Sequence, residues 1–185
     1  MRILRASDHR RMPWKNGRGE TVEIAVFPPD ATVDTFDWRI SMATVAEDGP
    51  FSIFPGIDRT LSILEGRGME LSVEGRQTVV LTHDFAPYPF PADAATSARL
   101  LDGTITDLNV MTRRGRFSHS VAMVTAPRAL APADGLMLVL CHLGEMQVTS
   151  REATETLSAL DCVLLENGEA ANISGDSEGF VIKLS

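Results

Sequence analysis

The apolar residues of this chain come in short runs, and this pattern constrains its fold more than any other feature. Runs with β-branched members cover positions 22–27, 38–45 and 78–81, and glycine, proline or aspartate separates them. Such runs are typical of β-strands, whereas a sustained helical spacing of three and four residues is hard to find. The sequence therefore predicts an all-β fold built from many short strands.

The two halves of the chain share a quasi-repeat. Residues 63–66 and 141–144 each end a strand at glycine, and each is followed by a hairpin and a leucine-containing segment closed by aspartate, at 79–84 and 157–161. Such a glycine gives a tight turn its backbone freedom. Repetition of the unit predicts two related β-barrels or sandwiches, and chance similarity among hairpins is the alternative.

The stretch 126–135 is rich in alanine and proline, which suits a connector between the two repeats. We expect an N-terminal barrel with the ligand pocket at residues 1–125. A second, smaller barrel is expected at 126–185, completed by N-terminal strands. Because the segment around Gly144 has no arginine or histidine cluster, the second barrel is expected to be mainly structural.

Charge and cysteine content narrow the class of protein. The 185 residues carry a net charge of −8, and the isoelectric point is near 5.0, which argues against general attraction to nucleic acid or to acidic membranes. Cys141 and Cys162 lie within apolar stretches, as buried thiols do in a reducing compartment. We expect a cytoplasmic protein with no nucleic-acid or membrane partner.

The glycine at position 66 anchors a comparison with cupins, whose first motif has the form G-x5-H-x-H-x(3-4)-E-x6-G. Counting back from Gly66 places Arg59 at the glutamate position, and the two histidine positions fall near Ser52 and Phe54. All three metal-ligand positions are lost, so we expect no metal and no cofactor. Arginine offers a planar fork of donors that matches a carboxylate, which predicts an anion site at Arg59.

Two alternatives bear on this anion site. Arg59 could instead form a structural ion pair with Asp58 or Asp48. Arg39 could supply a second charge to an interior site, although an arginine on a sheet surface is the commoner case.

Other polar and aromatic residues are candidates for the same pocket. The glycine-containing stretch 12–21 carries Trp14 and Asn16, which could line a pocket or form a surface turn. Strand alternation at 38–43 and 107–111 predicts that Arg39 shares a face with Ser41, and Asp107 shares one with Asn109. The predicted ligand-binding residues are Trp14, Asn16, Arg39, Phe51, Ser52, Phe54, Arg59, Asp107 and Asn109.

Four separated blocks, at 14–21, 38–41, 49–59 and 107–111, together resemble the HutD/Ves family. The resemblance implies a two-cupin architecture and, for HutD members, an association with bacterial histidine utilisation. The role that it implies is regulation of histidine degradation through binding of an intermediate such as urocanate or formiminoglutamate. Ves members are linked to stress responses instead.

Three functional hypotheses follow. The first is non-catalytic binding of a small carboxylate, with Arg59 as the anion anchor, aromatic walls and polar selectors. The second is a metal-independent isomerase or hydrolase in which Asp107 exchanges a proton. The third is a protein-interaction module, and a homodimer is compatible with any of the three.

Overall fold

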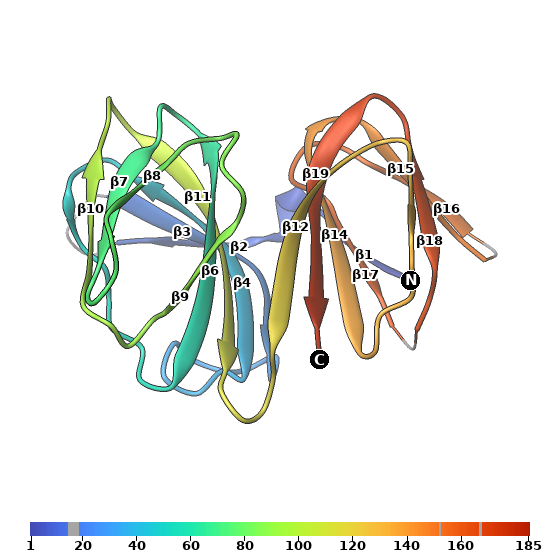
Figure 1. The fold of residues 1–185 in the computed structure, drawn as a ribbon. Coiled ribbons are helices and arrows are strands. Elements are labelled where there is room, and N and C mark those ends of the chain that lie inside the picture. Colours follow the sequence, from blue (N-terminus) through green and yellow to red (C-terminus); the bar gives the residue numbers. More distant parts are fainter. Residues whose placement is uncertain (15–18, 152, 167) are drawn as a thin grey trace. The chain divides into compact units, whose positions relative to one another are not determined.

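A computed structural model describes residues 1–14, 19–151, 153–166 and 168–185 of the chain. These residues form β-strands and one short 3-10 helix, and they include no α-helix (Figure 1). No helix within these ranges is long and apolar enough to cross a membrane. The predicted all-β class is confirmed.

The chain divides into two compact units. Residues 10–118 form one unit, called the N-terminal sandwich below, while residues 1–9 and 119–185 form the other, called the C-terminal sandwich. Both ends of the chain belong to the C-terminal sandwich. The chain passes from one unit to the other between Ser118 and His119. The domain boundary expected after residue 125 stays a prediction.

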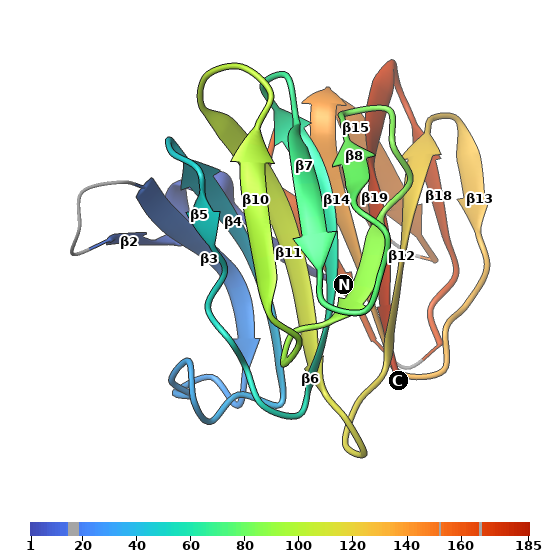
Figure 2. The same cartoon turned by 60° about the vertical axis from the view of Figure 1, so that its left-hand side comes forward.

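The N-terminal sandwich consists of a six-stranded sheet, in the order β2-β3-β4-β11-β6-β9, and a four-stranded sheet, in the order β5-β10-β7-β8 (Figure 2). Its strands are β2 (Arg10–Pro13), β3 (Gly19–Phe27), β4 (Trp38–Val45), β5 (Gly49–Pro50), β6 (Ile57–Glu65), β7 (Met69–Val73), β8 (Val79–Leu81), β9 (Tyr88–Pro91), β10 (Thr96–Leu100) and β11 (Ile105–Arg113). Buried side chains of both sheets, such as Leu61 and Leu71, share one apolar cluster. The two sheets therefore enclose a common interior.

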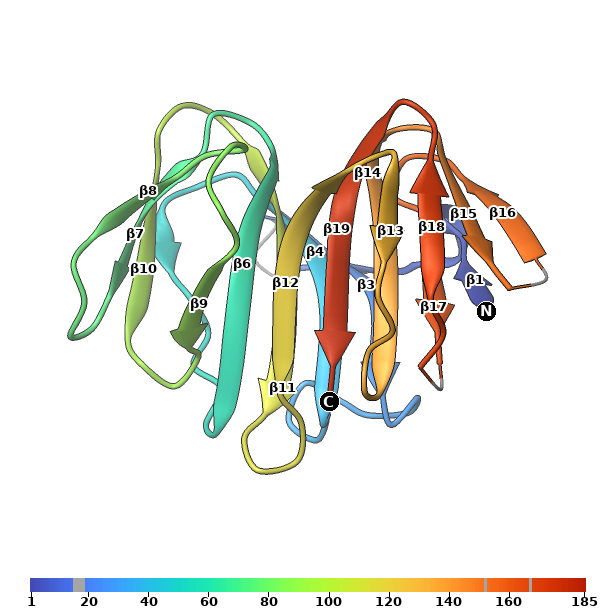
Figure 3. The same cartoon turned by 45° about the vertical axis from the view of Figure 1, so that its right-hand side comes forward.

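The C-terminal sandwich pairs a five-stranded sheet, in the order β1-β17-β14-β19-β12, with a four-stranded sheet, in the order β13-β18-β15-β16 (Figure 3). Its elements are β1 (Arg2–Leu4), the 3-10 helix η1 (Ala6–Asp8), β12 (His119–Thr125), β13 (Arg128–Leu130), β14 (Leu136–Gly144), β15 (Met146–Ser150), β16 (Ala153–Leu157), β17 (Cys162–Leu165), β18 (Ala171–Ser174) and β19 (Ser177–Leu184). The first strand of the chain adds an edge to this unit because β1 pairs with β17.

The quasi-repeat of the sequence corresponds to a repeat in the strand ladders. Strand β6 pairs with β11 and has one unpaired extra residue, Leu64; strand β14 pairs with β19 and has His142 at the same point. In both cases a glycine lies two residues after the extra residue. These glycines, Gly66 and Gly144, have positive φ angles of 89° and 79°. Each sandwich thus has a bulge and a turn glycine at matching positions, and two tandem units of one design are shown.

The two cysteines are buried free thiols. Cys141 is part of the apolar core of the C-terminal sandwich. Burial raises the pKa of both thiols above the usual range, which disfavours the reactive thiolate. Their prediction as buried thiols is confirmed.

Candidate ligand-binding site

A cavity of about 610 Å³ lies within the N-terminal sandwich. Eight of the nine predicted ligand-binding residues line it: Trp14, Arg39, Phe51, Ser52, Phe54, Arg59, Asp107 and Asn109. The ninth, Asn16, lies outside the described residues. The remaining lining residues, which the sequence reasoning did not select, are Met12, Pro13, Thr21, Val33, Ser41, Ala43, Val45, Pro50 and Met111. The structure therefore brings the predicted side chains together, and their binding of a ligand stays a prediction.

The polar floor of the cavity comes from one face of the six-stranded sheet. Alternation along β4 places Arg39 and Ser41 on this face, and alternation along β11 places Asp107 and Asn109 there. The register sets Asn109 directly opposite Ser41. The predicted division of both strands into two faces is confirmed.

Strand β6 contributes Arg59, which interrupts an otherwise apolar inner face. Ile57 and Leu61, two residues away on either side, are buried in apolar clusters. Arg59 itself is only 9 % exposed. A charged residue at an inward position of a core strand is uncommon, and it marks this point of the sheet as a functional candidate.

The guanidinium of Arg59 is held by an amide and two aromatic rings. Its Nε and Nη2 both donate to Asn109 Oδ1, the first at 2.8 Å. The ring of Phe51 lies 4.5 Å from the guanidinium carbon and the ring of Phe90 lies 5.6 Å from it, both within cation–π range. Burial lowers the pKa of Arg59 to about 10, against the charge of Asp107, so the group remains a cation at neutral pH.

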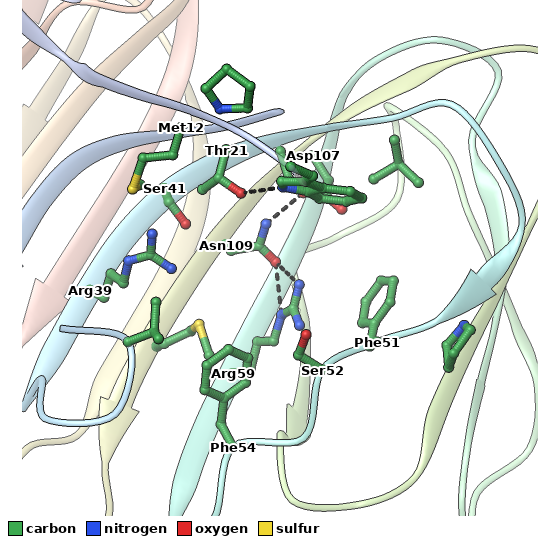
Figure 4. A pocket seen from close by; sticks show the side chains of 17 residues that line it. Met12, Thr21, Arg39, Ser41, Phe51, Ser52, Phe54, Arg59, Asp107 and Asn109 are labelled. Atoms are coloured by element: carbon green, nitrogen blue, oxygen red, sulfur yellow. Dashed lines mark hydrogen bonds between the residues drawn. The ribbon is translucent and has the colours of Figure 1, made fainter. Parts of the chain in front are cut away.

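Asp107 lies at the other end of the same hydrogen-bonded chain. Asn109 Nδ2 donates to Asp107 Oδ1 at 2.5 Å, so the Asn109 amide bridges Arg59 and Asp107 (Figure 4). Burial raises the pKa of Asp107 to about 6, while the charge of Arg59 and hydrogen bonds from Asn109 and the Ala43 backbone oppose that rise. A carboxyl with such a pKa exchanges protons near neutral pH.

Arg39 forms a second charged pair beside the floor. Its Nε donates to Glu23 Oε2 at 2.7 Å, and both side chains are buried. The commoner case of a surface arginine is therefore wrong here. Sequence reasoning missed Glu23, although the alternation of Thr21 and Glu23 along β3 places both on the face that continues Arg39 and Ser41.

Aromatic side chains form the walls of the cavity. Trp14 is fixed by a 2.8 Å hydrogen bond from its indole Nε1 to Thr21 Oγ1. A Cβ on Gly19 would come within 2.9 Å of the Trp14 ring, so this glycine lets the backbone approach the indole. Phe51 and Phe54 come from the segment between β5 and β6, where Ser52 adds a hydroxyl.

The alternative ion pairs for Arg59 are wrong. Asp58 precedes Arg59 on β6, is exposed, and accepts a 2.7 Å hydrogen bond from Arg114. Asp48 accepts from the Leu100 backbone nitrogen at 2.7 Å. Neighbouring residues of a strand point to opposite faces, which explains why Asp58 cannot reach the cavity side of Arg59.

The matching ladder positions of the C-terminal sandwich have no charged residue. Arg59 lies five residues before the β6 bulge, and Met137 holds that place in β14. The positions of Asp107 and Asn109 correspond to Gly179 and Val181 on β19. Met137 and Val181 pack in an apolar cluster. Of the two strand pairs compared, β6–β11 therefore carries the polar floor, and β14–β19 is apolar at the matching positions.

The cavity has the wrong donor set for a metal. Its charged lining residues are Arg39, Arg59 and Asp107, and a guanidinium repels a cation. In the described part of the chain, no three His, Cys, Asp or Glu side chains cluster in a way that could hold an ion. The arrangement of cationic donors, an amide and aromatic walls is suited to a small organic anion.

A model of the HutD family matches residues 6–182. The chain belongs to this family. An uncharacterised 21.2 kDa protein encoded in the hutC 3′ region of Pseudomonas putida is 32 % identical over 170 residues, covering 91 % of this chain and 88 % of that protein. Protein Ves of Citrobacter koseri is 46 % identical over 121 residues, or 62 % of this chain and 60 % of the relative.

Solved structures agree with the HutD family assignment. HutD from Pseudomonas fluorescens SBW25, solved in a formate condition, is 30 % identical and has a TM-score of 0.86, with 100 % of this chain and 97 % of that chain covered. A cupin 2 conserved barrel domain protein from Leptotrichia buccalis has a TM-score of 0.59 at 11 % identity, with 95 % of each chain covered, and shows the cupin fold alone. The HutD family is associated with histidine utilisation, and this chain shares its cupin fold.

Proposed function

We propose that this HutD-family protein binds a small carboxylate metabolite without transforming it. The observation that carries the proposal is the state of Arg59, a buried cation that lines a cavity and is hydrogen-bonded to a neutral amide. Two of its nitrogens, Nε and Nη2, donate to Asn109. A carboxylate can accept from such a guanidinium through a charge-assisted hydrogen bond.

From the same geometry we assign separate roles to the residues that line the cavity. Arg59 is the anion anchor and Arg39 a second cation, while Trp14, Phe51 and Phe54 form apolar walls. Asp107, Asn109 and Ser52 supply acceptors and donors that select among acids. Because the family is associated with histidine utilisation, we propose urocanate or formiminoglutamate as the ligand. Occupancy of the cavity would then report the level of a histidine-degradation intermediate and regulate the pathway.

Calorimetric titration tests this proposal. Metal-stripped protein is titrated with urocanate, formiminoglutamate, glutamate and formate. We expect saturable binding of one of the first two acids, and its loss in Arg59→Ala. The matched control is Arg99→Ala, which removes an exposed arginine paired with Glu70 outside the cavity and should bind normally. Circular dichroism checks that each variant is folded; absence of binding by folded wild-type protein would contradict the proposal.

A second candidate function is metal-independent isomerisation or hydrolysis of a small acid. The observation that favours it is Asp107, whose pKa of about 6 suits a general acid or base beside the cation of Arg59. Turnover of one of the four acids, lost in Asp107→Asn while binding persists, would support catalysis. Chromatography over hours follows the formation of product. Stable binding with no product would contradict catalysis and leave binding as the proposed function.

A further inference from the structure

The buried charges around the cavity floor already balance. Arg39 is paired with Glu23, and Arg59 is linked to Asp107 through Asn109. These four groups comprise two cations and two carboxylates. A simple carboxylate that enters at Arg59 adds an uncompensated negative charge to a site of low dielectric constant, which is costly.

The Asn109 amide gives the floor a donor end and an acceptor end. Its oxygen is occupied by Arg59 and its nitrogen by Asp107, so the amide is oriented by both neighbours. Figure 4 shows the three side chains in this order along the floor, with Arg59 and Asp107 on either side of Asn109. A ligand that spans Asn109 meets cationic donors at one end and a carboxylate acceptor at the other.

We infer that the cavity selects dipolar acids, which place a carboxylate at Arg59 and a protonated nitrogen at Asp107. This inference rests on the proposed function and names its ligand class. A dipolar ligand satisfies both ends of the floor and leaves the buried charge balanced. When an acid that lacks the nitrogen cation binds, Asp107 must take up a proton. The added negative charge then faces a neutral carboxyl group.

The surroundings of Asp107 support this coupling to protons. The charged group that acts on Asp107 is Arg59 on β6, and its own strand contributes the neutral Asn109. Arg39 on β4 acts on Arg59 and is itself paired with Glu23 on β3. The pKa of Asp107, raised by burial to about 6, already lies close to neutrality. A negative ligand beside it raises that pKa further, so uptake of a proton is the accessible way to restore balance.

A matched pair of acids tests the inference on unmodified protein. Formiminoglutamate and N-formylglutamate share the glutamate skeleton, but the first carries a protonated nitrogen where the second has a carbonyl oxygen. Titration at pH 7.5 should give about tenfold tighter binding of formiminoglutamate, the size expected of one charge-assisted hydrogen bond. Repetition in buffers of different ionisation enthalpy should show more proton uptake for N-formylglutamate than for formiminoglutamate, because the two acids bring net charges of −2 and −1.

Variants separate the outcomes. In Asp107→Asn the preference should fall to within about twofold, because one charge-assisted bond is lost, whereas Asp102→Asn, in an exposed turn, should keep it. Equal affinity and equal proton uptake for the two acids, with both lost in Arg59→Ala, would overturn the dipolar inference and leave the proposed function standing. Failure of both acids and of urocanate to bind would overturn the two together.

Discussion

The guanidinium of Arg59 is hydrogen-bonded to Asn109, although the backbone of Arg59 pairs with Met111 on the same neighbouring strand. The side chain therefore reaches back along β11 by one inward position. This reach joins Arg59 to the Asp107 end of the floor through one amide. It turns three inward positions of two strands into a single polar unit beside the apolar cluster of the sandwich.

The first prediction concerns the coupling of Arg59 and Asp107. Arg59→Met introduces the residue found at the matching position of the C-terminal sandwich, but leaves Asp107 buried without its cation. We expect the free energy of unfolding at pH 8 to fall by about 3 kcal/mol. The double variant Arg59→Met/Asp107→Asn should recover most of this loss, measured by urea denaturation. Additive effects of the two substitutions would show that the pair is not coupled.

The second prediction is a pH dependence of stability. The folded-state pKa of Asp107, about 6, lies above its ordinary value of 3.8, so the folded protein holds this proton more tightly than the unfolded chain. The contribution is full below pH 4 and is lost as pH rises through about 6, and the shift amounts to roughly 3 kcal/mol. Denaturation curves between pH 4 and 8 should show that slope in the wild type.

The control for this pH dependence is Asp107→Asn, which should flatten the slope between pH 4 and 7. Asp93 acts in the opposite sense and at lower pH, because hydrogen bonds from Arg114 lower its pKa to about 2. The difference between wild type and variant is therefore the quantity to compare. An unchanged slope in Asp107→Asn would assign the effect to another group.

The third prediction uses the repeated turn glycines. A Cβ on Gly66 would lie 2.6 Å from the Thr104 carbonyl oxygen, and one on Gly144 would overlap the carbonyl oxygen of Asp176. Since both also have positive φ, alanine at either site should lower stability by roughly 2–4 kcal/mol. Gly56→Ala is the control: φ is 72° but nothing lies within 4 Å, so a loss of about 1 kcal/mol is expected. Equal losses in all three variants would refute the steric argument.

The fourth prediction concerns the charge balance of the floor. Glu23→Gln removes the carboxylate partner of Arg39 and leaves the buried set with one excess positive charge. Binding of N-formylglutamate should strengthen by about three- to tenfold at low salt. Glu20→Gln, on the same strand, removes the surface partner of Arg11 and should change affinity little. Titration of both variants decides the point, and equal gains would indicate a long-range charge effect.

Much of this protein could be predicted from local pattern. Short β-branched runs separated by turn residues determined the all-β class, because alternation and turn preference are properties of the strand itself. The same alternation separated Asp107 and Asn109 from Leu108, and Arg39 from Ile40. The spacing from Gly66 identified Arg59. A turn of this kind requires glycine, so Gly66 gave the motif comparison a definite starting position.

Only the tertiary structure decided which groups meet. Arg59 finds Asn109, fifty positions away in the chain, and Arg39 finds Glu23, because strand order and register bring these side chains together. The bulge in β3 between Glu23 and Ala25 shifts the register of β3 against β4 by one residue, and no local sequence pattern predicts this shift. Charge balance in a cavity is a sum over such non-local pairs. The sequence alone therefore identified Arg59 as the candidate anchor, and the packing of six strands decided its partners.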